Sequence, residues 1–169
     1  MRLNVPFRGK SVFLGAILIL VLAWTCETLY APVVCSQEAK KEGWGTPLRG
    51  HIKEPVDKSR VSRHFNVSGT ITGGPIQHLW LIERIGNQHW PKEPELRPAN
   101  GRWQGEVFEG GNPLNGAFEI LLVDVSAETA RKFREWVQTG HRTGSYPGIQ
   151  VRGLGKHSIL DTKTYTLTE

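Results

Sequence analysis

Hydrophobic and polar positions alternate in short runs over much of the chain from about residue 61 onward. In RHFNVSGTITG, for example, Phe65, Val67 and Ile71 fall on one face, as in a half-buried strand. Other runs, such as AFEILLVDV, are apolar on both faces, which is typical of central strands. Turn sequences such as GGNPLNG separate the runs. The pattern predicts five strands, within residues 63–73, 77–85, 102–110, 117–125 and 157–168.

The period then changes to that of a helix in SAETARKFREWVQTG. A short helix is predicted over about 127–139, with Ser126 as its N-cap and Gly140 as its stop. Glu128 lies in the first turn, where the helix dipole favours an anion. The positions predicted to share the apolar face are Ala130, Phe133, Trp136 and Val137.

Two segments interrupt this pattern. GNQHWPKEPELRPANG (86–101) contains three prolines and glycines at its ends, so it is predicted to be a long loop. HRTGSYPGIQVRGLG (141–155) is predicted to be irregular. Five strands and one helix, without an alternating β-α rhythm, indicate a mainly β fold, an antiparallel sandwich over residues 61–169. We expect the helix to close one open end of the sandwich.

The N-terminal segment, residues 1–36, has the features of an export or anchoring sequence. Residues 1–10 carry three basic side chains and no acid, and an apolar run follows from Val12 to Trp24. This order predicts a cytoplasmic N-terminus and a following domain outside the cell membrane. A single-pass anchor over residues 12–31 is favoured, and a cleaved signal that leaves a secreted or periplasmic protein is the alternative.

Residues 37–60 have no lasting apolar period and contain several glycines and prolines. Such a composition buries too little apolar surface to offset chain entropy, so a flexible linker is predicted here. Both cysteines, Cys26 and Cys35, precede it. The predicted domain therefore contains neither a disulfide nor a thiolate metal site. An exported domain without disulfides fits a bacterial envelope better than an extracellular animal protein.

The charge balance argues against nucleic-acid binding. The formal net charge of the chain is +5, and removal of residues 1–36 leaves 18 basic and 15 acidic side chains, a net charge of +3. This excess is small and scattered, whereas nucleic-acid binders cluster their basic residues. The six histidines lack the spacing of a helical zinc site, and no metal or cofactor is predicted.

Catalytic patterns are equally scarce. No Gly-x-Ser-x-Gly motif is present. Glu83, Glu106, Glu109 and Asp124 lie in or beside predicted strands, and a glycosidase would need two such carboxylates facing each other across a cleft. Spacing along one chain does not show such a pair, so solvent-facing strand positions are the simpler interpretation. We therefore expect no catalytic residues, with a hydrolase as the least favoured alternative.

Aromatic residues are the best candidates for a binding site. Trp80, Trp103 and Trp136 are expected in the core, where each would bury roughly 150–250 Å². His89, Trp90 and Tyr146 fall in the two predicted irregular segments, which could meet at one end of a sandwich. These three residues form the predicted binding site.

The order of several segments resembles a β-sandwich module of bacterial proteins. HLWLIERIGNQHWP, NGRWQGEVFEGG, GAFEILLVDVSAETARKFREWVQTG and TGSYPGI carry this resemblance, which covers roughly residues 64–168. The module is immunoglobulin-like and occurs attached to signalling or surface proteins. The resemblance implies a non-catalytic interaction role and a protein partner. The alternative is a carbohydrate-binding module whose glycan stacks on the loop aromatics.

Overall fold

The computed structural model describes residues 46–168 of the chain. Within them the secondary structure is mainly β, with one α-helix and a 3-10 turn at Val151–Gly153. The elements are β1 (Arg49–Glu54), β2 (Arg60–Val61), β3 (His64–Thr72), β4 (Leu79–Ile85), β5 (Gln88–Leu96), β6 (Arg102–Phe108), β7 (Ala117–Val125), α1 (Ala127–Thr143), β8 (Ile149–Gln150) and β9 (His157–Leu167).

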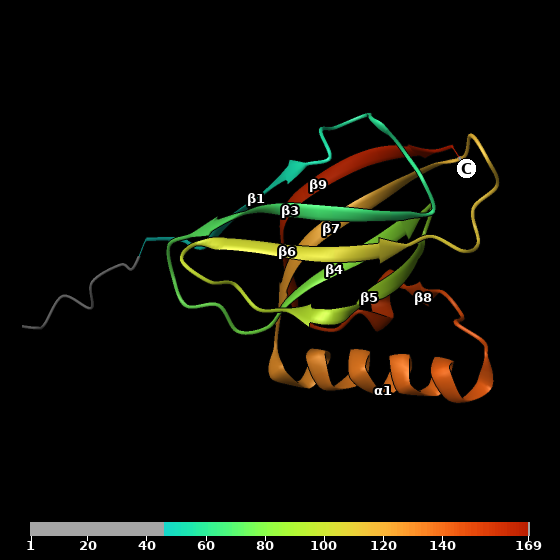
Figure 1. Ribbon diagram of the computed structural model, residues 1–169. Coiled ribbons are helices and arrows are strands. Elements are labelled where there is room, and N and C mark those ends of the chain that lie inside the picture. Colours follow the sequence, from blue (N-terminus) through green and yellow to red (C-terminus); the bar gives the residue numbers. More distant parts are fainter. Residues whose placement is uncertain (1–45, 169) are drawn as a thin grey trace, which may run out of the picture. The chain divides into compact units, whose positions relative to one another are not determined.

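The strands form two sheets that pack face to face. One sheet has the order β1-β3-β6, and the other has the order β2-β9-β7-β4-β5-β8. All pairings are antiparallel except that of β2 with β9, which is parallel. Figure 1 shows α1 along the side of the larger sheet that faces away from β3 and β6. The described residues therefore form three layers: small sheet, large sheet and helix.

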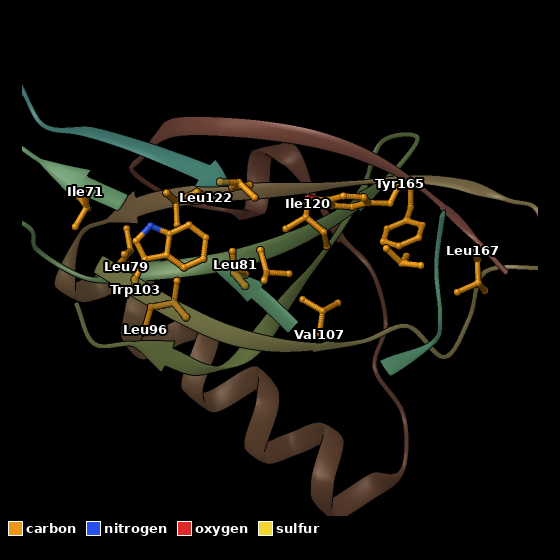
Figure 2. Close-up of a cluster of buried hydrophobic side chains, with 14 residues drawn as sticks. Ile71, Leu79, Leu81, Leu96, Trp103, Val107, Ile120, Leu122, Tyr165 and Leu167 are labelled. Atoms are coloured by element: carbon orange, nitrogen blue, oxygen red, sulfur yellow. The ribbon is translucent and has the colours of Figure 1, made fainter. Parts of the chain in front are cut away.

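The core between the two sheets is built from alternate residues of their strands (Figure 2). Val67 and Ile71 of β3 and Trp103 and Val107 of β6 face it from the small sheet. Gly69 lies beneath Trp103, and a Cβ at this glycine would come within 2.6 Å of the indole ring. The side chain of Trp103 is 4% exposed, so its predicted place in the core is confirmed.

A second core lies between the large sheet and the helix. Trp80, Ile82 and Leu121 from the sheet pack there with Phe133, and the rings of Trp80 and Phe133 meet edge to face at 5.4 Å. The expectation that the helix closes an open end of the sandwich is therefore wrong. Strands β4 and β7 are apolar on both faces because each is covered by the small sheet on one side and by α1 on the other.

The start of α1 agrees with the prediction, but its end does not. Ser126 is the N-cap, and its hydroxyl accepts a hydrogen bond from the backbone N–H of Thr129 at 3.3 Å. The helix continues through Gly140 to Thr143 and ends at Gly144, which has a φ of 70°. Gly140 has a packing role instead, because the ring of Tyr146 occupies the space that a Cβ there would need.

The five predicted strands are confirmed as β3, β4, β6, β7 and β9. The loop predicted over residues 86–101 is wrong, because β5 occupies most of it. Gly86 and Asn87 form a tight turn, and Pro91 and Pro94 lie within the strand. Only the start of β5 is paired on its outer side, with the two-residue β8, so these prolines lie where an N–H is not needed for the sheet.

The predicted linker also contributes to the domain. Residues 49–54 form β1, which pairs with β3, and residues 60–61 form β2, which pairs with β9. Ile52 is buried between the sheets, and its N–H donates to the carboxylate of Asp161 at 2.7 Å. The prediction of a flexible linker is therefore wrong for these residues.

The predicted anchor, residues 12–31, lies outside the described residues, as do the rest of residues 1–36 and both cysteines. Among residues 46–168, no helix combines the length and the apolar character that a membrane span requires.

Candidate functional site

A cavity of about 880 Å³ lies beside the free edge of β5, next to the C-terminal half of α1. Its volume is within the usual range for small-molecule sites. The lining residues come from five parts of the fold: Glu83 and Ile85 of β4; Trp90, Pro91, Lys92 and Glu93 of β5; Glu106 and Phe108 of β6; the segment Glu109–Pro113; and Trp136, Val137, His141 and Tyr146 from α1 and the segment after it.

Aromatic side chains form one wall of this cavity. The indole N–H of Trp90 donates to the carbonyl of Tyr146 at 2.9 Å, and that of Trp136 donates to the carbonyl of Pro147 at 3.0 Å. The rings of Trp136 and Tyr146 meet at a centroid distance of 5.5 Å. Two tryptophans from different elements thus hold the segment after α1 against the cavity, which their rings also line.

A buried charged cluster forms the opposite part of the lining. The side chain of Glu83 points to the same side of β4 as Leu81, into the region between the sheets, and is only 3% exposed. The ammonium of Lys92 lies against Oε2 of Glu83 and also donates to the carbonyl of Phe108 at 2.8 Å. Lys92 therefore connects β4, β5 and the end of β6 at this point.

Glu109 completes the cluster from the other sheet. One of its carboxylate oxygens, Oε1, accepts hydrogen bonds from the backbone N–H groups of Gly111 at 2.7 Å and Asn112 at 2.6 Å. The guanidinium of Arg63 donates to the carbonyl of Glu109 at 3.1 Å, which fixes the start of the turn. The carboxyl groups of Glu83 and Glu109 also hydrogen-bond to each other.

The two carboxyl groups differ in how readily they ionise. Burial raises the pKa of Glu83 to about 8, and the hydrogen bond to Glu109 raises it further, whereas Lys92 acts against both. Burial also acts to raise the pKa of Glu109, but hydrogen bonds from Glu83, Asn112 and Gly111 outweigh it and lower the value. At neutral pH Glu83 therefore carries a proton that it donates to the Glu109 carboxylate.

Three buried polar atoms beside the cavity have no conventional hydrogen-bond donor or acceptor opposite them among the described residues. They are Oε1 of Glu83, Oε2 of Glu109 and Nδ2 of Asn112. The shared proton accounts for the two carboxyl oxygens, but nothing accounts for the amide of Asn112. This amide is enclosed within the protein, because its side chain packs against Gly116, where a Cβ would lie 2.7 Å from Nδ2.

Two of the three predicted binding residues lie at the cavity, and the third lies elsewhere. Trp90 and Tyr146 both line the cavity, and their hydrogen bond joins them directly. Trp90 lies in β5 rather than in a loop.

His89 is not part of this site. It is 2% exposed and lies opposite Arg84 on the helix-facing side of the sheet, where its ring meets the carbonyl of Ile149 at 3.3 Å. Burial lowers the pKa of His89 and keeps its ring neutral. The prediction that His89 is in a loop beside Trp90 and Tyr146 is therefore wrong.

Several lining residues were not predicted from the sequence. Trp136 was predicted to be in the core, but it is half-buried and lines the cavity. Glu83 had a recognisable signal, because it interrupts the apolar run LWLI-E-RI of a strand buried on both faces. Its contacts with Lys92 and Glu109 join β4, β5 and the turn after β6, and such pairing cannot be read from spacing along one chain.

Metal binding finds no support among residues 46–168. No group of three or more His, Cys, Asp or Glu side chains in this range is positioned to hold an ion. The cluster around Glu83 contains a lysine at its centre, and its donor set does not suit a cation that needs several free carboxylates.

Comparisons with known proteins do not identify a family for this chain. No protein-family model matches the chain, and a search of curated proteins found no match. Among solved structures, the chain is similar to an engineered protein from the Northeast Structural Genomics Consortium, whose crystal structure was determined at 1.98 Å resolution. The sequences are 12% identical, the match covers 73% of this chain and 20% of that chain, and the TM-score is 0.42. The chain thus spans about a fifth of the length of that protein.

Proposed function

We propose that this protein is a non-catalytic binding module that holds a small ligand or a partner side chain in the cavity beside β5. The domain lies outside the cell membrane, tethered through residues 12–31, and its two packed sheets form an immunoglobulin-like sandwich. The packing of two sheets whose strands are antiparallel, apart from the β2–β9 pair, supports the immunoglobulin-like sandwich.

One observation carries the proposal. The cavity combines aromatic walls with a few polar and charged lining residues, among them Lys92, Glu93 and His141. Binding sites have this composition, a mostly apolar concave surface with a few fixed polar groups.

A fragment screen on the full chain, followed by NMR of backbone amides, tests the proposal. We expect ligands that perturb Gly110, Gly111 and His141, which surround the cavity. The substitution Phe108→Ala removes a lining ring that is 53% exposed, so it should weaken binding by about 10-fold. Ile159→Ala is the control, because Ile159 is 49% exposed and lies outside the cavity. Ligands that perturb only other surfaces, or that ignore Phe108→Ala, would contradict the proposal.

A glycan is the second candidate ligand, because Trp90, Trp136 and Tyr146 line one cavity and sugar rings stack on such side chains. Soluble cell-wall glycans and a glycan array provide the test. The glycan candidate survives if Trp90→Ala and Tyr146→Ala each abolish a measured affinity that Ile159→Ala preserves. It is dropped if no glycan binds the unaltered chain.

A hydrolase is less well supported. Glu83 and Glu109 are hydrogen-bonded to each other, whereas the two carboxyl groups of a glycosidase stand about 5 Å or more apart across the substrate. The pair is also engaged by Lys92 and by two backbone N–H groups. These carboxyl groups stabilise the cavity wall and leave no room between them for a glycosidic bond.

The membrane tether has its own test. Mass spectrometry of the purified chain should find residues 1–36 intact and the protein in the membrane fraction. An N-terminus at Ser36 or Gln37 would instead show that a signal sequence is removed.

A further inference from the structure

The charges around the cavity are unbalanced. Four carboxyl groups line it, those of Glu83, Glu93, Glu106 and Glu109, against one lysine and one histidine. Lys92 and His141 are the two basic residues of this lining.

Both of these basic side chains already have partners. Lys92 is bound to Glu83 and to the carbonyl of Phe108. The Nε2 atom of His141 lies 2.7 Å from the Oε1 atom of Glu93. An anionic ligand would therefore have to displace an existing partner from every basic group on the lining.

Glu106 is the carboxylate that remains available. It is exposed on β6, and no ion pair involves it among the described residues. It lies on the face of β6 opposite to Trp103 and Val107, which face the core, and it forms part of the cavity lining.

The aromatic wall also favours a cationic ligand over an anionic one. The indole N–H groups of Trp90 and Trp136 already donate to backbone carbonyls, so neither is free to donate to a ligand acceptor. What these rings offer a ligand is π surface, which attracts a cation and repels an anion.

We infer that the ligand of this cavity carries an organic cation on an apolar stem, either as a free small molecule or as the basic side chain of a peptide. The apolar stem packs on Phe108 and the tryptophan rings, and the cationic group lies within the field of Glu106. This inference rests on the proposed function, because it names the ligand class of the same cavity.

Isothermal titration of the full chain with three matched probes tests the charge preference. The probes are benzyltrimethylammonium, benzyl alcohol and benzylsulfonate, which share a ring and differ in charge. We expect benzyltrimethylammonium to bind about 10-fold more tightly than either of the others, and only its affinity to fall when sodium chloride is added. A peptide with one central lysine flanked by glycines, and its trimethyllysine form, then distinguish a peptide-borne cation from a free one.

Two matched variants test whether Glu106 causes the preference for the cationic probe. Glu106→Gln should weaken benzyltrimethylammonium binding about 3-fold and leave benzyl alcohol unchanged. Glu128→Gln removes the same charge from the first turn of α1, outside the cavity, and should change neither. Equal affinity for the cation and the neutral probe would overturn the inference while leaving the proposed binding function intact. Failure of all three probes and both peptides to bind the cavity would overturn the inference, and the fragment screen would then decide the proposed function separately.

Discussion

Glu83 is the residue whose environment differs most from the ordinary one for its type. It lies in the middle of β4, is 2% exposed, and has Leu81 and Ile85 as its nearest neighbours on the same strand face. An ionised carboxylate at such a position costs several kcal/mol unless it is paired. Its neutral form, the proton shared with Glu109 and the contact of Oε2 with the Lys92 ammonium together make this burial possible.

This arrangement makes the stability of the protein depend on pH. The folded-state pKa of Glu83 is raised to about 8 from an ordinary 4.5, so the folded state holds this proton more tightly than the unfolded state. The associated stability is fully present below pH 4.5 and is lost as pH rises through about 8. Glu83→Gln keeps the shape and cannot ionise, so this contribution is absent from the variant.

Thermal and urea unfolding at a series of pH values measures the effect. Relative to Glu83→Gln, the unaltered chain should lose roughly 1–3 kcal/mol of unfolding free energy between about pH 5 and pH 8. The comparison cancels the contribution of His89, whose lowered pKa acts with the opposite sign in the acidic part of this range. If the unfolding free energies of the two proteins changed equally with pH, Glu83 would be ionised in the folded state over this whole pH range.

At the level of elements, the predictions succeeded where one periodicity extended over a whole segment. The alternation in β3 and β6 and the helical period after Ser126 were sufficient to identify these elements. They failed at β5, because Pro91 and Pro94 suggest a loop unless the strand is known to lie at a sheet edge. Whether a strand lies at a sheet edge depends on the whole sheet, so it cannot be predicted from the sequence of the strand alone.

The end of α1 depends on tertiary packing in the same way. At Gly140 a Cβ would lie 2.1 Å from Cε1 of Tyr146, so alanine should destabilise the chain by about 1 kcal/mol although alanine favours helices. In a Tyr146→Ala background the clash is absent, and Gly140→Ala should instead stabilise by roughly 0.5–1 kcal/mol. Circular dichroism during thermal unfolding of the four proteins gives both values. The same sign in both backgrounds would contradict this role for Tyr146.

For the whole molecule, the mainly β class and the presence of two sheets were predictable, but the layer order was not. Either face of a doubly apolar strand can meet a sheet or a helix, and only the assembled fold shows which one α1 covers. For the same reason, the candidate site could be predicted only in part. Trp90 and Tyr146 stood out as aromatics in irregular sequence, whereas Glu83, Lys92 and Glu109 form a site only when β4, β5 and the turn after β6 come together.

The N-terminal boundary of the domain gives a prediction at this scale. A chain that begins at Val61 lacks β1, which buries Ile52 and pairs along β3. We expect this chain to unfold without cooperativity or to aggregate through the uncovered edge of β3, whereas one that begins at Lys40 should unfold in a single transition. Differential scanning calorimetry distinguishes the two. Equal transition temperatures would mean that β1 and β2 are dispensable.

The placement of the tryptophans has a practical consequence. Trp80 and Trp103 are fully enclosed in the two cores, whereas Trp90 and Trp136 are half-buried and face the same cavity. Enclosed indoles emit at short wavelength and are insensitive to added quenchers, while the other pair emits into a space that a ligand would fill. A ligand in the cavity should therefore change the emission wavelength of Trp90 and Trp136 and their sensitivity to quenchers. Intrinsic tryptophan fluorescence can thus report ligand binding without an added dye.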